Sequence, residues 1–541
     1  MRRLVVALIL LIAVAGGVVL MAGPGAQASP DATITVNSTA DTNTRDNDLT
    51  LREAIMLANG GLAVGDLLEE ECAEVSNSTY GPPCSTTDSI GAGSADTIEF
   101  NIPGTGPHTI QPASALPDIT DPVTIDGYTQ PGASANTNPP DLGSNAVLKI
   151  ELDGSNAGAG INGLKITAGS TTVRGLVINR FGFCGVLAVS NNVVLQGNFI
   201  GTDVTGTAAV GNGVGIYIDQ TPNGTIGGMA PGARNVISGN GSGVLLNHAG
   251  GTLVQGNLIG TNAAGTAEVG NTSEGIRIYG SGSSGCTIGG TTAAARNVIS
   301  GNTWGVEIGY FAAGNVIQGN FIGTNVAGTG ALGNHIWGVT IHNGANSNTV
   351  GGTASGTGNI IAYTGPGTLG NGQGVQVSGA SATGNTIRGN SIHSNVAQGI
   401  ENVNGGNAEL APPTIESVGA SVSGHTSPKC YPCTVEVFSD TEDEGRLFHG
   451  STTTNDDASG TWTYADPVTG PNITATITDA DGNTSEFSAP LAYYPPVGGI
   501  AALPDASGSS GPNHIPLAAL AAAVLVALGA SGWYARRRWL G

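Results

Sequence analysis

The stretch NVISGNGSGVLLNHAGGTLVQGNLIGTN, from Asn235 to Asn262, begins and ends with nearly the same phrase. Asn235-Val-Ile-Ser-Gly-Asn240 resembles Asn257-Leu-Ile-Gly-Thr-Asn262. Between them stand two more short apolar segments, one starting at Gly243 and one at Thr252. Short apolar or alternating runs that are rich in Val and Ile, and are interrupted by glycine, predict β-strands rather than helices. Each unit therefore contains three short strands.

The unit recurs along much of the chain. Its leading asparagine is found at Asn198, Asn235, Asn257, Asn297, Asn320, Asn359 and Asn390. These positions are 37, 22, 40, 23, 39 and 31 residues apart. A bare unit of 22 or 23 residues suits three short strands and three tight corners. Such a unit predicts a solenoid, in which each strand pairs with its equivalent one coil away.

The leading asparagines are predicted to be structural. Asparagine tolerates the left-handed backbone of sharp corners, and stacked asparagines form ladders of side-chain amides. The apolar Val, Ile and Leu positions are expected to stack inside the coils. We expect the seven asparagines to form such a ladder and not to bind a ligand.

The repeated Asn-x-Ile-x-Gly-Asn and Gly-Val-x-Ile units resemble the right-handed parallel β-helix family of exported bacterial proteins. The resemblance covers residues 146–405 and implies an all-β fold, a parallel β-helix. The right-handed sense of the helix is also implied by this resemblance. Three equivalent insertions interrupt the longer coils, at residues 201–212, 260–271 and 323–334. They should emerge on one side and line up along the axis, which makes them candidate binding loops. The alternative is that they pack on their neighbours.

Residues 31–145 are predicted to form a cap and the first strands. Thr50 and Glu53 have the spacing of a capping box, which predicts a helix over residues 51–59. Residues 49–54 resemble the CSLREA motif that precedes β-helices in exported bacterial proteins, with Leu49 in place of its cysteine. We interpret Arg52 and Glu53 as parts of a polar cap over the open solenoid end, with a catalytic pair as the alternative.

Residues 410–492 show short strands separated by turn residues, which is typical of a small β-sandwich. They resemble immunoglobulin-like modules of bacterial surface proteins. Four residues of one turn carry oxygen atoms that suit calcium: Asp479, Asp481, Asn483 and Glu486. A hairpin turn uses the same residue types, and the spacing is not that of an EF-hand. No metal site is predicted elsewhere, and no other cofactor is expected.

The ends of the chain indicate export. Residues 1–28 have the basic, apolar and small-residue regions of a signal peptide. A Pro/Gly/Ser linker at 493–513 precedes an uncharged stretch at 515–534, which has the length of a transmembrane helix, and a basic tail at 535–541. We expect a cell-surface protein held by this anchor. Residues 503–507 resemble a sortase signal, and attachment to the cell wall is the alternative.

Charge and cysteine content set further limits. The net charge of −22 argues against nucleic-acid partners and would attract cations. Six cysteines are too few to scaffold an exported chain of 541 residues. Cys72 with Cys84, and Cys430 with Cys433, are expected to be local pairs.

No catalytic motif is apparent. Charged residues lie on or beside the strands that follow the leading asparagines, and we interpret them as solvent-facing and not as a converging site: Asp219, Glu274, Arg277, Glu307 and His342. His248 and His393 are isolated in the sequence. No catalytic residue is therefore predicted.

The sequence favours a structural or adhesive surface protein that presents a rigid face to glycan or matrix, with the membrane as its other partner. The alternative is a polysaccharide lyase or glycoside hydrolase with an unrecognised site. The oligomeric state is left open.

Overall fold

The computed structural model describes residues 32–77, 90, 95–365, 372–426, 430–455 and 459–493. The predicted signal peptide, membrane segment and basic tail lie outside the described residues, as does the linker except for residue 493. Within the described part of the chain, no helix is long and apolar enough to cross a membrane.

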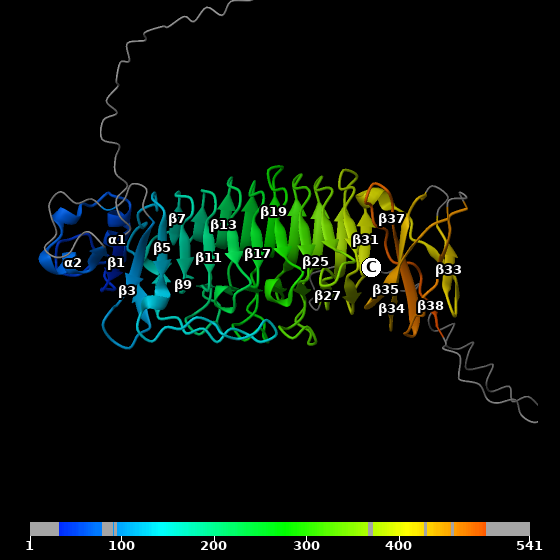
Figure 1. The fold of residues 1–541 in the computed structure, drawn as a ribbon, viewed down its shortest axis with the longest axis horizontal. Helices are drawn as coiled ribbons and strands as arrows, with labels where there is room; N and C mark the ends of the chain where they lie inside the picture. Colours follow the sequence, from blue (N-terminus) through cyan, green and yellow to red (C-terminus); the bar gives the residue numbers. More distant parts are fainter. Residues whose placement is uncertain are drawn as a thin grey trace, which may run out of the picture.

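Three sheets run along an elongated solenoid (Figure 1). The twelve-stranded sheet contains, in spatial order, β2 (Val75–Asn77), β1 (Ala32–Val36), β3 (Asp96–Phe100), β5 (Val123–Asp126), β8 (Thr172–Arg174), β11 (Val194–Gln196), β14 (Thr225–Gly227), β17 (Leu253–Gln255), β20 (Thr287–Gly289), β23 (Val316–Gln318), β26 (Thr349–Gly351) and β29 (Thr386–Arg388). The nine-stranded sheet contains β7 (Leu164–Ile166), β10 (Cys184–Ala188), β13 (Val214–Asp219), β16 (Ser242–Asn247), β19 (Glu274–Tyr279), β22 (Trp304–Gly309), β25 (Trp337–His342), β28 (Gln373–Ser378) and β31 (Ile400–Val403). The ten-stranded sheet contains β4 (His108–Ile110), β6 (Ile150–Asp153), β9 (Leu176–Asn179), β12 (Phe199–Ile200), β15 (Val236–Ile237), β18 (Leu258–Ile259), β21 (Val298–Ile299), β24 (Phe321–Ile322), β27 (Ile360–Ala362) and β30 (Ser391–His393).

The fold is a parallel β-helix, because each strand in the solenoid pairs in parallel with its equivalent in the next coil. In the ten-stranded sheet, for example, β15 pairs in parallel with β18, and β18 with β21. The antiparallel pairing of β1 with β2 at the N-terminal end is an exception. The predicted solenoid is thus confirmed, while its handedness stays a prediction.

The core consists of stacked aliphatic side chains. In the ten-stranded sheet, equivalent places are occupied by residues that are all 0% exposed: Ile237, Ile259, Ile299, Ile322 and Ile361. Burial of each such side chain contributes about 1.5–3 kcal/mol. This core runs without a break from Ala32 in β1 to Ile400 in β31. The solenoid thus has one continuous apolar core enclosed by the sheets.

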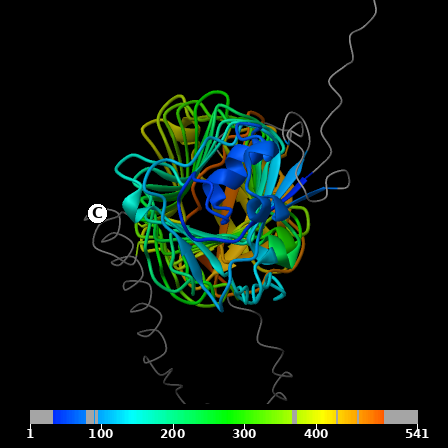
Figure 2. The same ribbon diagram turned by 90° about the vertical axis from the view of Figure 1, so that its left-hand side faces the viewer.

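A helical segment covers the N-terminal end. α1 (Leu51–Ala58) lies across the end of the solenoid in the axial view (Figure 2), and its Leu51, Ile55 and Leu57 join the core. The predicted capping box is confirmed, because Thr50 Oγ1 accepts from Glu53 N and Glu53 Oε2 accepts from Thr50 N. α2 (Glu69–Ala73) and the 3-10 helices complete the helical content: Val64–Asp66, Gly127–Thr129, Gly154–Asn156, Pro231–Ala233, Ala293–Ala295 and Gly406–Glu409.

Arg52 and Glu53 belong to this cap and have different partners. Arg52 Nε lies 2.8 Å from Oδ1 of Asp41, while Glu53 contacts Thr50 and Arg45. Their separate partners give both side chains a structural role at the solenoid end.

Two antiparallel sheets follow the last coil (Figure 1). One has the order β32 (Thr414–Val418), β33 (Val422–His425), β36 (Thr461–Tyr464), and the other β35 (Leu447–Thr453), β34 (Thr434–Asp440), β37 (Asn472–Thr478), β38 (Leu491–Ala492). They have their own core around Trp462 and contain the disulfide Cys430–Cys433, which confirms that pair. Cys84 lies outside the described residues, so the other pair stays a prediction. The likeness to an immunoglobulin module is likewise still a prediction.

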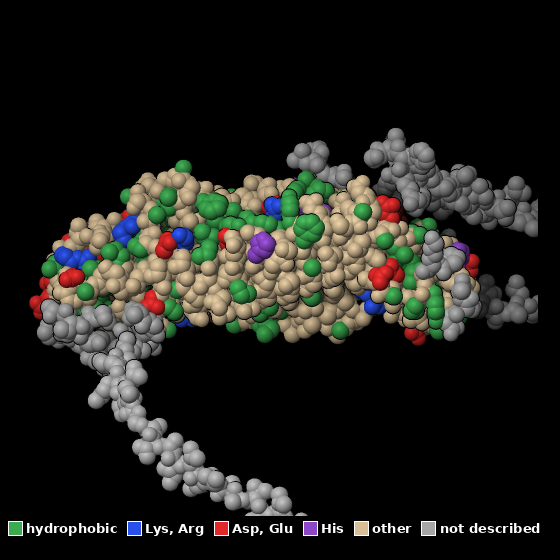
Figure 3. All heavy atoms as spheres, turned by 90° about the horizontal axis from the view of Figure 1, so that it is seen from above, with side chains coloured by type: hydrophobic (Ala, Val, Ile, Leu, Met, Phe, Trp, Pro, Cys, Tyr) green, Lys and Arg blue, Asp and Glu red, His purple; other side chains and the backbone are tan. Residues whose placement is uncertain are grey.

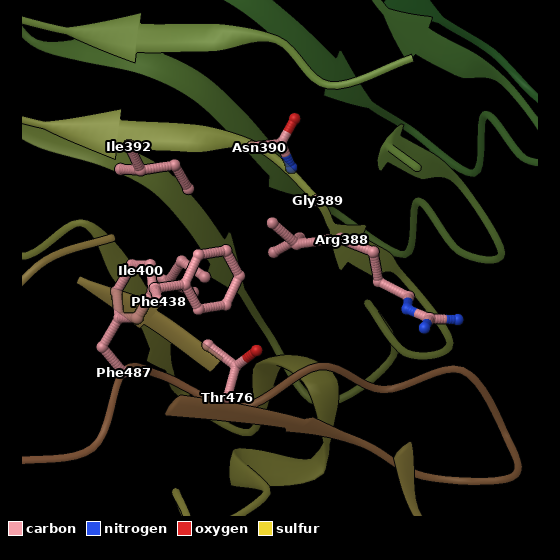
Figure 4. Close-up of a pocket in the computed structure, with 9 residues that line it drawn as sticks. Arg388, Gly389, Asn390, Ile392, Ile400, Phe438, Thr476 and Phe487 are labelled. Carbon is pink, nitrogen blue, oxygen red and sulfur yellow. The ribbon is translucent and has the colours of Figure 1, made fainter. Parts of the chain in front are cut away.

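This antiparallel unit packs on the open C-terminal end of the solenoid. Arg388 Nε at the end of β29 lies 2.8 Å from Oε1 of Glu436 in β34. Figure 4 shows Ile392 and Ile400 of the last coil facing Phe438 and Phe487. The last coil is therefore covered by side chains of the next unit, which shields its strand edges from pairing with another chain.

Candidate functional site

The candidate site lies on the outer side of the nine-stranded sheet, where side chains from neighbouring coils stand in register. Arg277 of β19 pairs with Glu307 of β22, and Glu274 pairs with Trp304. His342 is the last residue of β25, one coil further on. Neighbouring parallel strands are about 4.8 Å apart, which places these side chains within reach of one another.

Four ionisable groups meet at this place. Arg277 Nη1 lies 3.6 Å from Glu274 Oε1, and Arg277 Nε lies 3.2 Å from Glu307 Oε2. His342 Nε2 lies 2.8 Å from Glu307 Oε1. We call Glu274, Arg277, Glu307 and His342 the four-residue cluster. The expectation that these charged residues do not converge is wrong.

The two carboxyl groups lie beneath the side chains of Arg277 and His342. The side chains of Glu274 and Glu307 are 4% and 1% exposed, whereas those of Arg277 and His342 are 27% and 25% exposed. A substrate arriving from solvent therefore meets Arg277 and His342 first. Buried carboxylates beneath them orient these groups through charge-assisted contacts.

The two glutamates have pKa values shifted in opposite directions. Burial raises the pKa of Glu307, although its hydrogen bond with His342 and the charge of Arg277 oppose the rise. Burial would also raise the pKa of Glu274, but hydrogen bonds from Ser242, from backbone and from Glu307 outweigh it and lower that pKa. Glu307 therefore has the higher pKa of the pair and Glu274 the lower. Such a split within a carboxylate pair is typical of sites that move protons.

A missing side chain makes room for His342. Gly309 ends β22, and a Cβ atom at this position would lie 3.1 Å from His342 Nε2. Any other residue here would press on the imidazole that contacts Glu307. The glycine thus allows His342 to reach back over the preceding coil.

Aromatic rings surround Arg277. Its guanidinium lies 4.9 Å from the ring centroid of Tyr279 and 5.4 Å from that of Tyr310, within the range of cation–π attraction. Tyr310 also makes an edge contact with His342, with 6.1 Å between the ring centroids. Tyr310 and Phe311 have φ angles of 54° and 66°, a left-handed conformation that costs energy for bulky residues. They are 46% and 63% exposed, so strain holds two large aromatic side chains outward beside the cluster.

Asp219 lies on the same sheet but outside the cluster. It accepts a hydrogen bond of 2.7 Å from Asn247 Nδ2. Asp219, Asn247 and Tyr279 are paired in register on three successive strands of this sheet. His248 and His393 are also elsewhere, as predicted from their isolation. His248 Nδ1 accepts from Gly282 N, and His393 contacts Ser394 and Tyr363.

The three candidate loops line up as predicted, and they pack on one another. Ala263 N donates to Gly206 O, and Val326 N donates to Gly265 O, both at 2.8 Å. Ala263 and Val326 join an apolar cluster with Phe199, Leu258 and other outward residues of the ten-stranded sheet. The loops at 201–212, 260–271 and 323–334 therefore form a second layer on that sheet. Their apolar side chains are used for packing, which is the alternative that the sequence left open.

The leading asparagines form a continuous ladder. Asn198, Asn235, Asn257, Asn297, Asn320, Asn359 and Asn390 are all buried, and each of the first six donates from its backbone N and from Nδ2 to Oδ1 of the next. A second ladder, which the sequence analysis missed, runs through Asn212, Asn240, Asn271, Asn302 and Asn334. Asn240 and Asn302 are the last asparagines of an Asn-x-Ile-x-Gly-Asn phrase, whereas Asn212, Asn271 and Asn334 end the three loop insertions. A third ladder comprises Asn315, Asn348, Asn385 and Asn407.

The calcium candidates serve the turn and the junction with the solenoid. Asp479 Oδ1 accepts from the backbone N of Asp481 and of Asn483. Asn483 Oδ1 accepts from Gly384 N, and Glu486 Oε1 accepts from Asn402 N in the last coils. In the described residues, no group of three or more His, Cys, Asp or Glu side chains is arranged to hold a metal ion.

Charge is unevenly spread on the face shown in Figure 3. Hydrophobic side chains gather in patches near the middle of the long axis, whereas Asp and Glu are seen mainly toward the two ends. The middle of this face therefore presents mainly apolar and uncharged polar groups, with a Lys or Arg side chain and a His side chain among them. Such a surface suits ligands with both apolar and hydroxyl groups.

Comparisons with solved structures return several similar chains of very low sequence identity, three of which are described below. The Azotobacter vinelandii mannuronan C-5 epimerase AlgE4 A-module is 15% identical over 58% of this chain and 75% of its own, with a TM-score of 0.36. Geobacillus virus E2 ORF18 is 11% identical over 85% and 76%, with a TM-score of 0.31. Tailspike protein 2 of Escherichia coli O157:H7 bacteriophage CAB120 is 12% identical over 74% and 62%, with a TM-score of 0.23. At these scores no activity is transferred to this chain.

No family model matches the sequence, and no curated protein matches it. Any function must therefore be argued from the four-residue cluster itself.

Proposed function

We propose that the chain cleaves polysaccharides that contain uronic acid residues, by β-elimination at the four-residue cluster. The observation that carries this proposal is that the buried Glu307 contacts both Arg277 and His342, the two members exposed to substrate. A lyase needs a cation to neutralise the uronate carboxylate and a base to take the proton next to it. Arg277 and His342 supply these two groups on one face.

The reaction assigns one role to each exposed group. Arg277 binds the uronate carboxylate, and that charge neutralisation makes the C5 proton easier to remove. Neutral His342 takes the C5 proton, the bond between C4 and the glycosidic oxygen breaks, and a C4–C5 double bond forms. The leaving oxygen takes a proton from water, and the imidazolium later returns its proton to solvent. Glu307 and Glu274 act as positioning residues that hold His342 and Arg277.

The geometry favours this chemistry over hydrolysis. A glycoside hydrolase uses two carboxyl groups about 5–10 Å apart on either side of the scissile bond. Here the side chains of Glu274 and Glu307 are both buried beneath Arg277 and His342. Two carboxyl groups buried under the same surface do not flank a glycosidic bond from opposite sides, as hydrolysis requires.

Adhesion without cleavage is the second candidate function. The three aligned loops, which the sequence suggested as a binding surface, give adhesion little support, because their apolar residues are packed inward. The same aromatic side chains around Arg277 would still bind a glycan. The export signal and surface anchor inferred from the sequence would bring either activity into contact with extracellular glycans.

Product analysis tests the proposal. The full chain is incubated with polygalacturonate, alginate and hyaluronan, and with neutral mannan as a control. Ultraviolet absorbance detects the conjugated double bond of the product. We expect product from at least one uronate polymer, none from mannan, and loss of product in Arg277→Met. Arg174→Met is the matched control, because Arg174 pairs with Asp126 on another sheet.

Two other outcomes would contradict the proposal. One is glycan binding without any unsaturated product, which would support adhesion. The other is Arg277→Met with the activity of the unchanged protein.

A further inference from the structure

A second group of side chains continues the face beyond the four-residue cluster. Trp304, Trp337 and Gln373 begin β22, β25 and β28, and they are paired in register from one coil to the next. Glu274 occupies the preceding place in the same column. With about 4.8 Å between neighbouring strands, the column runs along the solenoid axis away from Glu274.

All three residues carry polar atoms that make no hydrogen bond. These atoms are Nε1 of Trp304, Nε1 of Trp337 and Oε1 of Gln373. Gln373 is 3% exposed, so its carbonyl oxygen is buried as well as unpaired. An unpaired buried polar group costs about 1–3 kcal/mol. With one such atom in each of three consecutive coils, the column has two donors and one acceptor for which a ligand could provide partners.

The two indole rings add an apolar surface. Their centroids are 5.2 Å apart and their planes are inclined by 54°. Both tryptophans are only partly buried. A ligand for this place must therefore have an apolar C–H face for the rings, and hydroxyl groups that both accept from indole N–H and donate to an amide oxygen. A pyranose sugar has this combination.

Charge limits the class of sugar. Trp304, Trp337 and Gln373 carry no formal charge, and the adjoining Glu274 has a lowered pKa and is ionised. An anionic residue placed on this column would lie beside Glu274 without a cation of the column to neutralise it, unlike the uronate on Arg277. An uncharged sugar meets no such penalty.

We infer that Trp304, Trp337 and Gln373 form a subsite for an uncharged sugar residue, next to the uronate that Arg277 binds. This inference rests on the proposed function and refines it. The substrate is then a heteropolysaccharide in which uronate and neutral residues are joined, and not a polyuronate homopolymer. Because the two indole N–H groups are buried in the free chain, the inference requires the indole rings to rotate when the sugar binds.

Indole resonances in ¹⁵N-labelled full-length chain test the subsite directly. The probes are a hyaluronan hexasaccharide, which alternates uronate and N-acetylglucosamine, and hexagalacturonate, which has uronate alone. We expect the indole N–H signals of Trp304 and Trp337 to shift with the hyaluronan probe and to stay in place with hexagalacturonate. Trp462 is the internal control, because its Nε1 is also unpaired but lies in the core of the antiparallel unit.

Binding to variants completes the test. Trp304→Ala should weaken the affinity for the hyaluronan hexasaccharide about tenfold, the effect of losing a contact of about 1.4 kcal/mol. Trp304→Phe keeps a ring without the N–H group, and should lose a smaller part of the affinity. Both variants should keep the unfolding midpoint of the unchanged protein, so that a loss of affinity is not due to a loss of folding.

The outcomes separate this inference from the proposed function. If a uronate polymer is cleaved but the two indole signals stay in place with the hyaluronan probe, the subsite is wrong and the lyase assignment stands. If the signals shift but no unsaturated product forms from any uronate polymer, the subsite stands and the lyase assignment is wrong. Equal shifts with both probes would contradict the selectivity for an uncharged sugar.

Discussion

His342 Nε2 lies 2.8 Å from Oε1 of Glu307, a carboxyl group whose side chain is 1% exposed. The contact joins two coils of the solenoid and places an imidazole at the surface above a buried acid. A base held in one orientation by a third group is a recurring arrangement in catalysis. In the proposed reaction His342 is this base, and Glu307 is the group that holds it.

Replacing Glu307 by Gln keeps the shape of the side chain but removes the acid. We expect the rate of product formation to fall about 10-fold or more, because His342 loses the carboxyl group that holds its imidazole in place. The substrate KM should change little, since Glu307 is buried and Arg277 keeps its exposed position. Steady-state kinetics on the best uronate polymer measures both constants. A large rise in KM with an unchanged kcat would show that Glu307 serves substrate binding instead.

The interior of the first asparagine ladder should be sensitive to truncation. Asn297 accepts from the backbone N and from Nδ2 of Asn257, and it donates to Val254 O. In Asn297→Ala these buried partners lose their hydrogen bonds, and we expect the free energy of unfolding to fall by about 4 kcal/mol. Denaturant unfolding measures the loss.

Ser281→Ala is the control, because Ser281 is exposed on a turn between coils. Its effect should stay within about 0.5 kcal/mol. A loss of less than about 1 kcal/mol in Asn297→Ala would mean that the ladder contributes little to stability.

The junction with the antiparallel unit should make stability depend on pH through Glu444. Burial raises the pKa of Glu444 to about 8, and the neighbouring Asp440 and Asp443 add to the rise while hydrogen bonds from Asn395 oppose it. The folded chain binds this proton more tightly than the unfolded chain, whose carboxyl has a pKa near 4.5. The contribution of Glu444 is thus fully present below pH 4.5 and is lost as the pH rises toward about 8.

Thermal unfolding of Glu444→Gln measures this effect. The difference between the midpoints of the unchanged protein and the variant should grow steadily between pH 5 and pH 8, in favour of the variant. A difference that stays constant over this range would show that Glu444 is ionised in the folded chain throughout.

The first packed loop should tolerate an amide in place of its acid. Asp203 Oδ1 accepts from Thr207 N and Ala208 N, and the equivalent Asn262 accepts from Thr266 N and Ala267 N. We therefore expect Asp203→Asn to be neutral within about 0.5 kcal/mol and Asp203→Ala to cost about 1 kcal/mol at neutral pH. Unfolding midpoints of the two variants provide the measurement. Equal losses in both would show that the charge, and not the hydrogen bonds, is what the loop needs.

Low pH should remove the stability that the ionised Asp203 carboxylate contributes. Burial would raise the pKa of Asp203, but hydrogen bonds from Thr205, Ala208 and Thr207 outweigh it and lower that pKa. The stability that it contributes is present above the pKa of the unfolded carboxyl and is lost as the pH falls through the lower folded value. Below that range, Asp203→Asn should be at least as stable as the unchanged protein.

Much of the solenoid could be predicted because its signals are local. The phrase around Asn235 repeats at Asn257, and alternation of Val and Ile with polar residues is visible within each strand. The capping box at Thr50 likewise needs only four residues. The second ladder was missed because Asn271 follows a loop and Asn240 does not, so their equivalence is visible only in the register of the coils.

The candidate site could not be predicted because it depends on that register. Glu274, Glu307 and His342 come from three successive coils of unequal length, 33 and 35 residues apart in the chain. The sequence identified each as a charged residue on a strand face. It did not reveal that Gly309 leaves the space for His342 to reach Glu307, nor that Arg277 lies over both carboxylates.

The rate of unsaturated product formation in His342→Gln tests the central claim most directly. His248→Gln is the matched control, since His248 is an exposed histidine outside the cluster. The unchanged protein and His248→Gln should cleave the same uronate polymer at equal rates, while His342→Gln should be slower by about 10²–10⁴-fold, the typical contribution of a general base. Equal rates for all three proteins, or no product from the folded, unchanged protein with any uronate polymer, would contradict the claim.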